Sequence, residues 1–162
     1  CPHCLTTLKN DYAEIGTDLE VVHHSEFISD LIKDGKIEPE ASLEEDVTFH
    51  DACYVGRHHG EYDAPRDVLQ SVLSEKATIK EMPRNKQDSF CCGAGGGNMW
   101  YEIKQGKRIN VERFEEAIET GVKKVATSCN FCMIMMEDGR KVTGQDENME
   151  VYDIAELVAE RI

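Results

Sequence analysis

Two adjacent cysteines lead directly into a glycine-rich stretch, Cys91-Cys92-Gly93-Ala94-Gly95-Gly96-Gly97. Adjacent cysteines rarely form a disulfide with each other, because the resulting ring is small and strained. Glycine tolerates positive φ, so the backbone N–H groups of such a run can converge on an anion. The stretch therefore predicts an anionic, sulfur-ligated group bound against the main chain.

Five of the seven cysteines form a spaced set around this stretch: Cys53, Cys91, Cys92, Cys129 and Cys132. An adjacent pair together with a Cys-x-x-Cys pair is typical of metal ligands rather than of a disulfide scaffold. A structural zinc takes four ligands and a cubane iron–sulfur cluster takes four cysteines. Five thiolates indicate a larger polynuclear centre, or four ligands and one spare. An iron–sulfur cluster is favoured, and zinc remains an alternative or a substitute.

The composition excludes several classes of protein. The 162 residues include 32 acidic and 18 basic side chains, which gives a net charge of −14 and makes nucleic acid a poor partner. No apolar run approaches the ~18 residues of a membrane span, and no signal peptide is expected. The use of cysteine predicts a reducing, cytoplasmic setting.

Predicted strands and helices alternate along the chain, which favours an α/β fold with a parallel, Rossmann-like sheet flanked by helices. The predicted strands are 20–24, 46–50, 78–82, 124–127 and 150–152. The predicted helices are 1–13, 25–33, 64–73, 99–104, 108–120, 132–138 and 154–162, and the segments 54–63 and 83–89 are predicted loops. Since Cys53, Cys91 and Cys129 each follow a predicted strand, with only a weak one before Cys91, we expect the ligand cysteines at the C-terminal strand ends.

The chain contains an internal repeat. Cys1-Pro2-His3-Cys4 precedes a predicted helix, strand and second helix, and Cys129-x-x-Cys132 precedes the same succession. We interpret residues 1–40 as the truncated tail of a first repeat and 41–162 as a complete cysteine-rich domain. Because the chain begins inside a Cys-x-x-Cys pair, we expect it to be a piece of a longer polypeptide, in which a membrane anchor could precede it.

The cysteine pattern resembles the CCG cysteine-rich domain found in heterodisulfide reductase and its relatives. These relatives include iron–sulfur components of glycolate and lactate oxidases and a membrane-bound branch similar to electron-transfer-flavoprotein:menaquinone oxidoreductases. The segments that look closest to this last branch are 50–58, 90–97, 99–100 and 108–110.

This resemblance implies that Cys53, Cys91, Cys92, Cys129 and Cys132 supply five thiolates to a noncubane [4Fe-4S] cluster. It implies that Cys1 and Cys4 end a first motif whose other members lie outside this chain. In the closest branch it further implies electron-transfer flavoprotein as the donor and menaquinone as the acceptor, through a membrane part upstream.

Other residues near the cysteines allow more than one interpretation. Gly93, Gly95 and Gly96 could donate N–H groups to the cluster sulfides, or form a plain tight turn. His50, His58 and His59 could supply a proton, although ordinary loop histidines are favoured. Arg57 could offset the charge of a cluster, or make a surface salt bridge. The remaining candidates are read as packing residues: Trp100 and Tyr101, which could also close the pocket, and Met133, Met135 and Met136.

The sequence therefore predicts an iron–sulfur electron-transfer domain of a heterodisulfide-reductase-like oxidoreductase. It would relay electrons between a flavoprotein donor and a quinone or other acceptor, as one domain or component of a larger complex. In the full-length protein it would lie in the cytoplasm or at the cytoplasmic face of the membrane. Two alternatives remain: a cluster that itself cleaves a disulfide or heterodisulfide, and a zinc-bound structural module.

Overall fold

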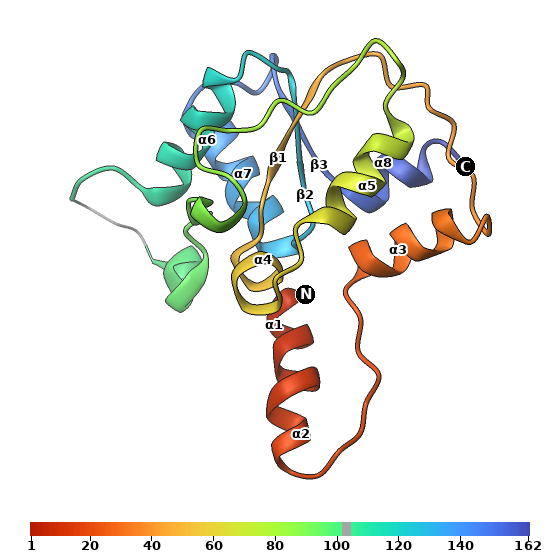
Figure 1. The fold of residues 1–162 in the computed structure, drawn as a ribbon. Helices are drawn as coiled ribbons and strands as arrows, with labels where there is room; N and C mark the ends of the chain where they lie inside the picture. The colour runs from red at the N-terminus through yellow and green to blue at the C-terminus, as the bar shows by residue number, and fades with distance from the viewer. Residues whose placement is uncertain (102–104) are drawn as a thin grey trace.

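The computed structural model describes residues 1–101 and 105–162 and contains a three-stranded parallel sheet (Figure 1). The strands are β1 (Val47–His50), β2 (Lys124–Thr127) and β3 (Glu150–Asp153), in the spatial order β1-β2-β3. In the register of the sheet, Phe49 pairs with Ala126 and Ala126 pairs with Tyr152. The predicted α/β fold with a helix-flanked parallel sheet is confirmed.

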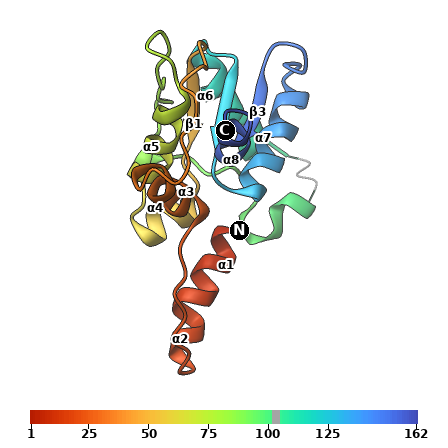
Figure 2. The same ribbon diagram turned by 90° about the vertical axis from the view of Figure 1, so that its right-hand side faces the viewer.

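Helices cover both faces of the sheet, as expected for parallel strands joined by helical crossovers (Figure 2). The helices α3 (His24–Lys33), α5 (Asp63–Val72) and α8 (Ile154–Ala159) pack together on one side, where Leu69 and Ile154 meet Phe49 in the core. The helices α6 (Ile109–Glu119) and α7 (Asn130–Val142) cover the other side, where Phe114 and Met136 meet Val125.

The N-terminal helical arm projects from the sheet and its helices (Figures 1 and 2). It comprises α1 (Pro2–Thr6), the π-helical turn η1 (Thr7–Asp11) and α2 (Tyr12–Glu14), which confirms the predicted helix there. The predicted strand at 20–24 is wrong, because no neighbouring strand of the described sheet pairs with it. His24 instead begins α3, whose N-cap is His23 rather than the predicted Ser25.

The predicted strand at 78–82 is also wrong, since it forms only a single bridge between Val47 and Ile79. The pairing stops after the N–H of Lys80 donates to Val47, and Pro83 has no N–H with which to extend it. The element η2 (Lys86–Asp88) that follows is a short 3₁₀ turn inside the predicted loop at 83–89.

The predicted loop at 54–63 is helical over most of its length. The helix α4 (Cys53–His59) ends at Gly60, which has φ of 73°. Gly56 lies within this helix because the ring of Tyr62 packs against it, and a Cβ there would lie 2.4 Å from Tyr62 Cε1. A residue that resembles a loop signal is therefore a packing residue inside a helix.

The last helices differ from the prediction in length. α7 continues through Gly139 to Val142, because Gly139 allows α6 to approach: a Cβ there would lie 2.8 Å from Phe114 Cβ. α8 ends at Ala159 rather than at Ile162. Of the helix predicted at 99–104, residues 102–104 lie outside the described residues, and Met99 and Trp100 belong to the 3₁₀ helix η3 (Gly95–Trp100). Within the described ranges, no helix combines the length and apolar character needed to cross a bilayer.

Candidate metal centre

Five cysteine side chains from three separate segments line one enclosed cavity: Cys53, Cys91, Cys92, Cys129 and Cys132. The sulfurs of the last two come from a single helical turn, and both residues are only 3% exposed. Cys92 is buried as well, whereas Cys53 and Cys91 are partly exposed. The structure thus brings together all five cysteines that the sequence singled out.

Two of the cysteine positions lie where a helix begins shortly after a strand. β1 ends at His50 and Cys53 is the first residue of α4, while β2 ends at Thr127 and Cys129 is the N-cap of α7. Cys91 and Cys92 follow a coil segment instead of the weak strand that the sequence suggests. Backbone N–H groups at a helix N-terminus favour negative charge, so Cys129 lies where a thiolate is stabilised.

The Cys-Cys-Gly turn requires glycine at its third position. Gly93 has φ of 89°, and a Cβ there would lie 3.1 Å from Ile109 Cβ and 3.2 Å from the backbone nitrogen of Asn110. The close approach of α6 and the left-handed backbone both exclude a larger residue. In this conformation the N–H of Gly93 donates to Cys91 Sγ at 3.2 Å.

The rest of the glycine stretch divides between the cavity and the surface. Gly95 lines the cysteine cavity, whereas Gly96 is exposed and is not among the residues that line it. Trp100 and Tyr101 are 81% and 76% exposed, so the prediction that they pack in the core or close the pocket is wrong. Trp100 instead lines a shallow surface groove with the glycine run and Phe131.

Crowding of the five sulfurs makes their protonation unequal. The thiols of Cys53 and Cys92 donate to Cys91 and hold its pKa far below the usual range. The bond to Cys91 and burial raise the pKa of Cys53. Hydrogen bonding from Cys132 lowers the pKa of Cys129 to about 7, and the pKa of Cys132 is raised well above its usual value by bonds to Cys129 and Cys92.

Five thiolates therefore cannot coexist in this cavity without added positive charge. A cationic metal group supplies that charge, because thiols lose their protons when they bind metal. A set of five converging, mostly buried thiols with backbone N–H donors beside them fits a polynuclear iron–sulfur group.

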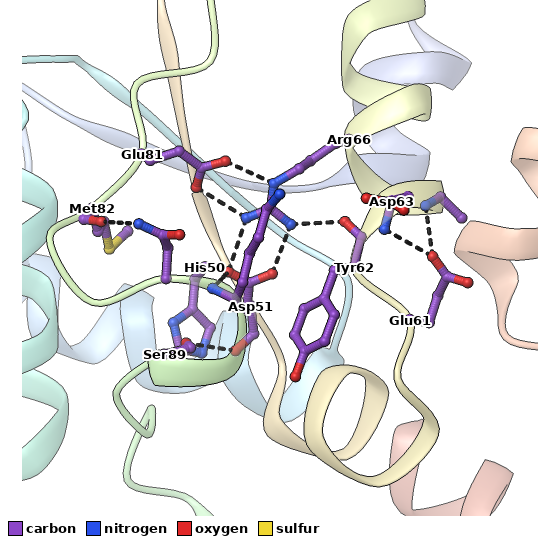
Figure 3. A network of polar contacts seen from close by, with 12 residues as sticks. His50, Asp51, Glu61, Tyr62, Asp63, Arg66, Glu81, Met82 and Ser89 are labelled. Atoms are coloured by element: carbon purple, nitrogen blue, oxygen red, sulfur yellow. Dashed lines mark hydrogen bonds and ion pairs between the residues drawn. The ribbon is translucent and has the colours of Figure 1, made fainter.

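A polar network braces the turn between β1 and α4 (Figure 3). The buried carboxylate of Asp51 accepts two hydrogen bonds from Arg66, of 2.8 and 3.0 Å, and one of 2.8 Å from the N–H of Lys86. Arg66 also pairs with Glu81. Ser89 Oγ donates to the carbonyl of Asp51 at 3.2 Å, so the network ties the segment before Cys53 to the segment before Cys91.

Arg57 acts on the same loop from α4. Its guanidinium donates to the backbone carbonyls of Gln87 and Ser89, rather than forming the surface salt bridge that the sequence left open. Sequence reasoning assigned no role to Arg66 or Asp51, because the network joins segments that are 15 or more residues apart.

His50 is not a loop histidine, in contrast to the prediction. It ends β1, is 1% exposed, and its Nδ1 accepts a 2.9 Å hydrogen bond from Nε of the fully buried Arg113. A ring nitrogen of His50 and the sulfurs of Cys92 and Cys132 lie within 4.8 Å of one another. Burial and the charge of Arg113 lower the pKa of His50 to about 3, so its ring is neutral.

Sequence reasoning missed Arg113 altogether. A signal was present, since Arg113 lies beside Phe114 and one turn after Asn110 on the buried side of α6. A charged residue that falls at a core position of an amphipathic helix marks a paired, buried side chain.

The N-terminal arm contacts the cavity, but its cysteines do not belong to it. Pro2 and His3 line the cavity, and the ring of His3 packs 4.1 Å from that of Tyr54. Cys1 and Cys4 are exposed and are not part of the lining. The two other candidate histidines lie outside the cavity: His58 stacks on Tyr54 and His59 hydrogen-bonds Thr6 Oγ1.

Comparison with known families decides the classification of this site. The family model described as "CCG: Cysteine-rich domain" matches residues 47–137, which is more than half of the chain. The chain belongs to this cysteine-rich domain family. The match contains all five converging cysteines and excludes Cys1 and Cys4.

Curated relatives of this CCG-domain chain are iron–sulfur oxidoreductases by name. It is 39% identical to the "Probable iron-sulfur-binding oxidoreductase FadF" of Bacillus subtilis and 39% identical to the "EtfAB:quinone oxidoreductase" of Syntrophomonas wolfei. These alignments cover 99% and 98% of the chain but only 23% of each relative. A third relative, 39% identical over 100% of the chain and 39% of its own length, is a component of the dihydromethanophenazine:CoB–CoM heterodisulfide reductase of Methanosarcina mazei.

Proposed function

We propose that this CCG-domain chain is the iron–sulfur electron-transfer part of a larger oxidoreductase. The observation that carries the proposal is the convergence of five cysteine sulfurs from three segments on one enclosed cavity. The family membership and the names of the relatives support an iron–sulfur group in that cavity. When bound, such a group accepts and releases single electrons without rearrangement of the chain.

The ligands that we propose are Cys53, Cys91, Cys92, Cys129 and Cys132, and the group that we propose is a noncubane [4Fe-4S] cluster. Five donors exceed the four that a zinc ion or a cubane cluster uses. The three most buried ligands, Cys92, Cys129 and Cys132, keep the group away from water. Cys53 and Cys91 form its more accessible side, from which an electron has the shortest path to a partner.

The chain itself stabilises the charge of the bound group. The N–H of Gly93 donates to Cys91, and the backbone at Ala94 lowers the pKa of Cys92, although other terms raise that pKa overall. Such N–H donors favour the more negative, reduced state of an iron–sulfur group. The Asp51 network fixes the spacing between the Cys53 and Cys91 segments, so that the five sulfurs keep their arrangement in both redox states.

The partners of this domain follow from the relatives as proposals. The name of the Syntrophomonas relative supports an electron-transfer flavoprotein as the donor and a quinone as the acceptor. The chain spans about a quarter of that relative, so the donor and acceptor sites would lie on other parts of the protein. We propose residues 1–40 as the tail of a first cysteine-rich repeat and 41–162 as the complete second one.

Location follows the same reasoning. A relative 38% identical over 98% of the chain is named "Probable membrane-anchored ferredoxin", which supports attachment to a membrane through a region outside this chain. We propose that the domain works at the cytoplasmic face.

A second candidate function is cleavage of a disulfide at the cluster itself. The partial exposure of Cys53 and Cys91 favours it, because a substrate sulfur could reach that side of the cavity. The relative named as part of a heterodisulfide reductase points in the same direction. Turnover of a disulfide by the reduced, isolated protein would support this function over simple electron relay.

The test is metal analysis of the full-length protein purified without oxygen. We expect iron and acid-labile sulfide in equal amounts, visible absorbance that bleaches on reduction, and a paramagnetic signal in one redox state. Stoichiometric zinc without iron, and no visible absorbance after reconstitution with iron and sulfide, would contradict both functions and leave a structural module.

A further inference from the structure

The pair formed by His50 and Arg113 has the features of a second layer around the cysteine cavity. His50 ends β1 and Arg113 lies in α6, and both side chains are buried, at 1% and 0% exposure. Arg113 Nε donates to His50 Nδ1 at 2.9 Å. The other ring nitrogen, Nε2, is buried and has no hydrogen-bond partner in the described part of the chain.

The identity of the partner fixes the tautomer of the histidine. A guanidinium has only N–H donors and no acceptor, so Nδ1 of His50 must offer its lone pair. The single proton of the neutral imidazole then lies on Nε2. A histidine that binds metal through Nε2 needs the opposite arrangement, in which Nδ1–H donates to a carboxylate or carbonyl. Here that arrangement would place two N–H donors against each other.

Arg113 is itself held in place, so this tautomer is held too. Its Nη1 donates to the carbonyl of Arg84 at 2.8 Å and also pairs with the carboxylate of Glu116. Glu116 is in turn paired with Arg84 at the surface of α6. Turning the guanidinium away from His50 would break these contacts inside the core.

The proton on Nε2 faces the cysteines. A ring nitrogen of His50 lies within 4.8 Å of the sulfurs of Cys92 and Cys132, and Nδ1 is already engaged by Arg113. We infer that Arg113 fixes His50 as a hydrogen-bond donor to the sulfurs of Cys92 and Cys132, which sets the reduction potential of the bound cluster without ligating it. This inference rests on the proposed iron–sulfur function.

The energetic consequence has a definite sign. Reduction adds negative charge to the cluster and its sulfurs, so a fixed N–H donor stabilises the reduced form more than the oxidised form. Loss of the donor therefore makes the potential more negative. We expect a change on the order of tenfold in the reduction equilibrium, which corresponds to about 59 mV for a one-electron couple.

The experiment is a mediated redox titration of the full-length holoprotein, with iron content measured in parallel. His50→Leu removes the donor, and His50→Gln retains an amide N–H near the position of Nε2. His58→Leu is the matched control, because His58 is exposed and lies outside the cavity. We expect iron content to stay at the wild-type level in all three, with a more negative potential in His50→Leu and a potential close to wild type in the other two.

Three results would overturn the inference. An unchanged potential in an iron-loaded His50→Leu protein would show that His50 donates nothing to the cluster. Loss of iron in both His50 variants, with the fold intact by circular dichroism, would make His50 a ligand. Pulsed paramagnetic resonance of the wild-type protein containing ¹⁵N-histidine gives an independent result: strong coupling from an iron-bound nitrogen would contradict the inference, and weak coupling would support it. A wild-type protein without iron would overturn the proposed function as well.

Discussion

The two Cys-x-x-Cys units of this chain share a plan but differ in outcome. In each unit the cysteine pair is followed by a helix and then by a second helix, α3 or α8, that begins with a capping box. The boxes are His23 with Glu26 and Asp153 with Glu156, which are 130 positions apart (153 − 23 and 156 − 26). The two caps even touch, since His24 Nε2 lies 3.1 Å from the carboxylate of Asp153.

The difference lies in what surrounds the cysteine pair. Cys129 and Cys132 are buried, because β2 delivers them to a point where Cys53, Cys91 and Cys92 also arrive. Cys1 and Cys4 are exposed on an arm that has no strand beside it in the described residues. A Cys-x-x-Cys pair therefore becomes a candidate centre only where the fold brings further sulfurs to it.

The largest expected effect comes from removing a shared ligand. In the 162-residue chain reconstituted with iron and sulfide, Cys132→Ser should abolish most of the bound iron, because it removes a buried sulfur at the centre of the set. Cys1→Ser is the matched control and should leave the iron content unchanged. Iron analysis and visible absorbance measure both, and equal losses would show that the two units are not different.

The next largest effect concerns the brace beneath the second unit. Asp51→Ala leaves the guanidinium of Arg66 without its buried partner and should lower the free energy of unfolding by about 3 to 5 kcal/mol, as for other broken buried ion pairs. Urea unfolding measures this loss. Asp67→Ala, which removes an exposed ion pair with Lys33, is the control and should cost less than about 1 kcal/mol. Similar losses in both would refute the bracing role.

Gly93→Ala should disturb the Cys-Cys-Gly turn without touching a sulfur. An alanine at φ of 89° is strained, and its Cβ would press on Ile109 and Asn110, so we expect a loss of about 1 to 3 kcal/mol of stability. Gly96→Ala also has positive φ, but open space around it, so it should cost less. Thermal unfolding of the two variants compares them, and a Gly96→Ala protein as unstable as Gly93→Ala would contradict the packing argument.

The first unit should show a pH dependence through its buried cap. Burial and the neighbouring His24 lower the pKa of His23 to about 4, so the folded state favours the neutral ring. Protonation therefore favours unfolding, and the stability that His23 contributes should be present above pH 6.5 and lost as the pH falls toward 4. His23→Asn keeps an acceptor for the cap and cannot titrate. The stability of the wild type relative to this variant should fall over that range, and a constant difference would refute the assignment.

The smallest effect tests the shared capping boxes. Glu26→Ala and Glu156→Ala each remove the side chain that accepts from the N-cap backbone, so each should cost about 1 kcal/mol. Chemical denaturation of both variants checks the equivalence of the two units. A large loss in one and none in the other would show that the boxes are alike in geometry only.

Much of this comparison was predictable from the sequence. The apolar runs that became β1, β2 and β3 are short and bounded by polar residues, so local pattern was enough. The cysteine set was predictable because ligand spacing is a local property of the chain. Whether these five cysteines bind a cluster, and whether 1–40 is the tail of a repeat, remain predictions.

What the sequence could not provide depends on pairing between distant segments. Residues 20–24 have the composition of a strand but no partner strand in the described sheet, and Gly56 looks like a loop residue until Tyr62 packs against it. The contact between His50 and Arg113 requires α6 to cross the end of β1, which no local pattern encodes.

The most direct test of the central claim is the protection of cysteines from alkylation in the reconstituted 162-residue chain, read out residue by residue by mass spectrometry. The account predicts that Cys53, Cys91, Cys92, Cys129 and Cys132 are protected until the iron is removed, while Cys1 and Cys4 are alkylated at once. Rapid alkylation of any of the five with iron bound, or protection of Cys1 and Cys4 in their place, would contradict it.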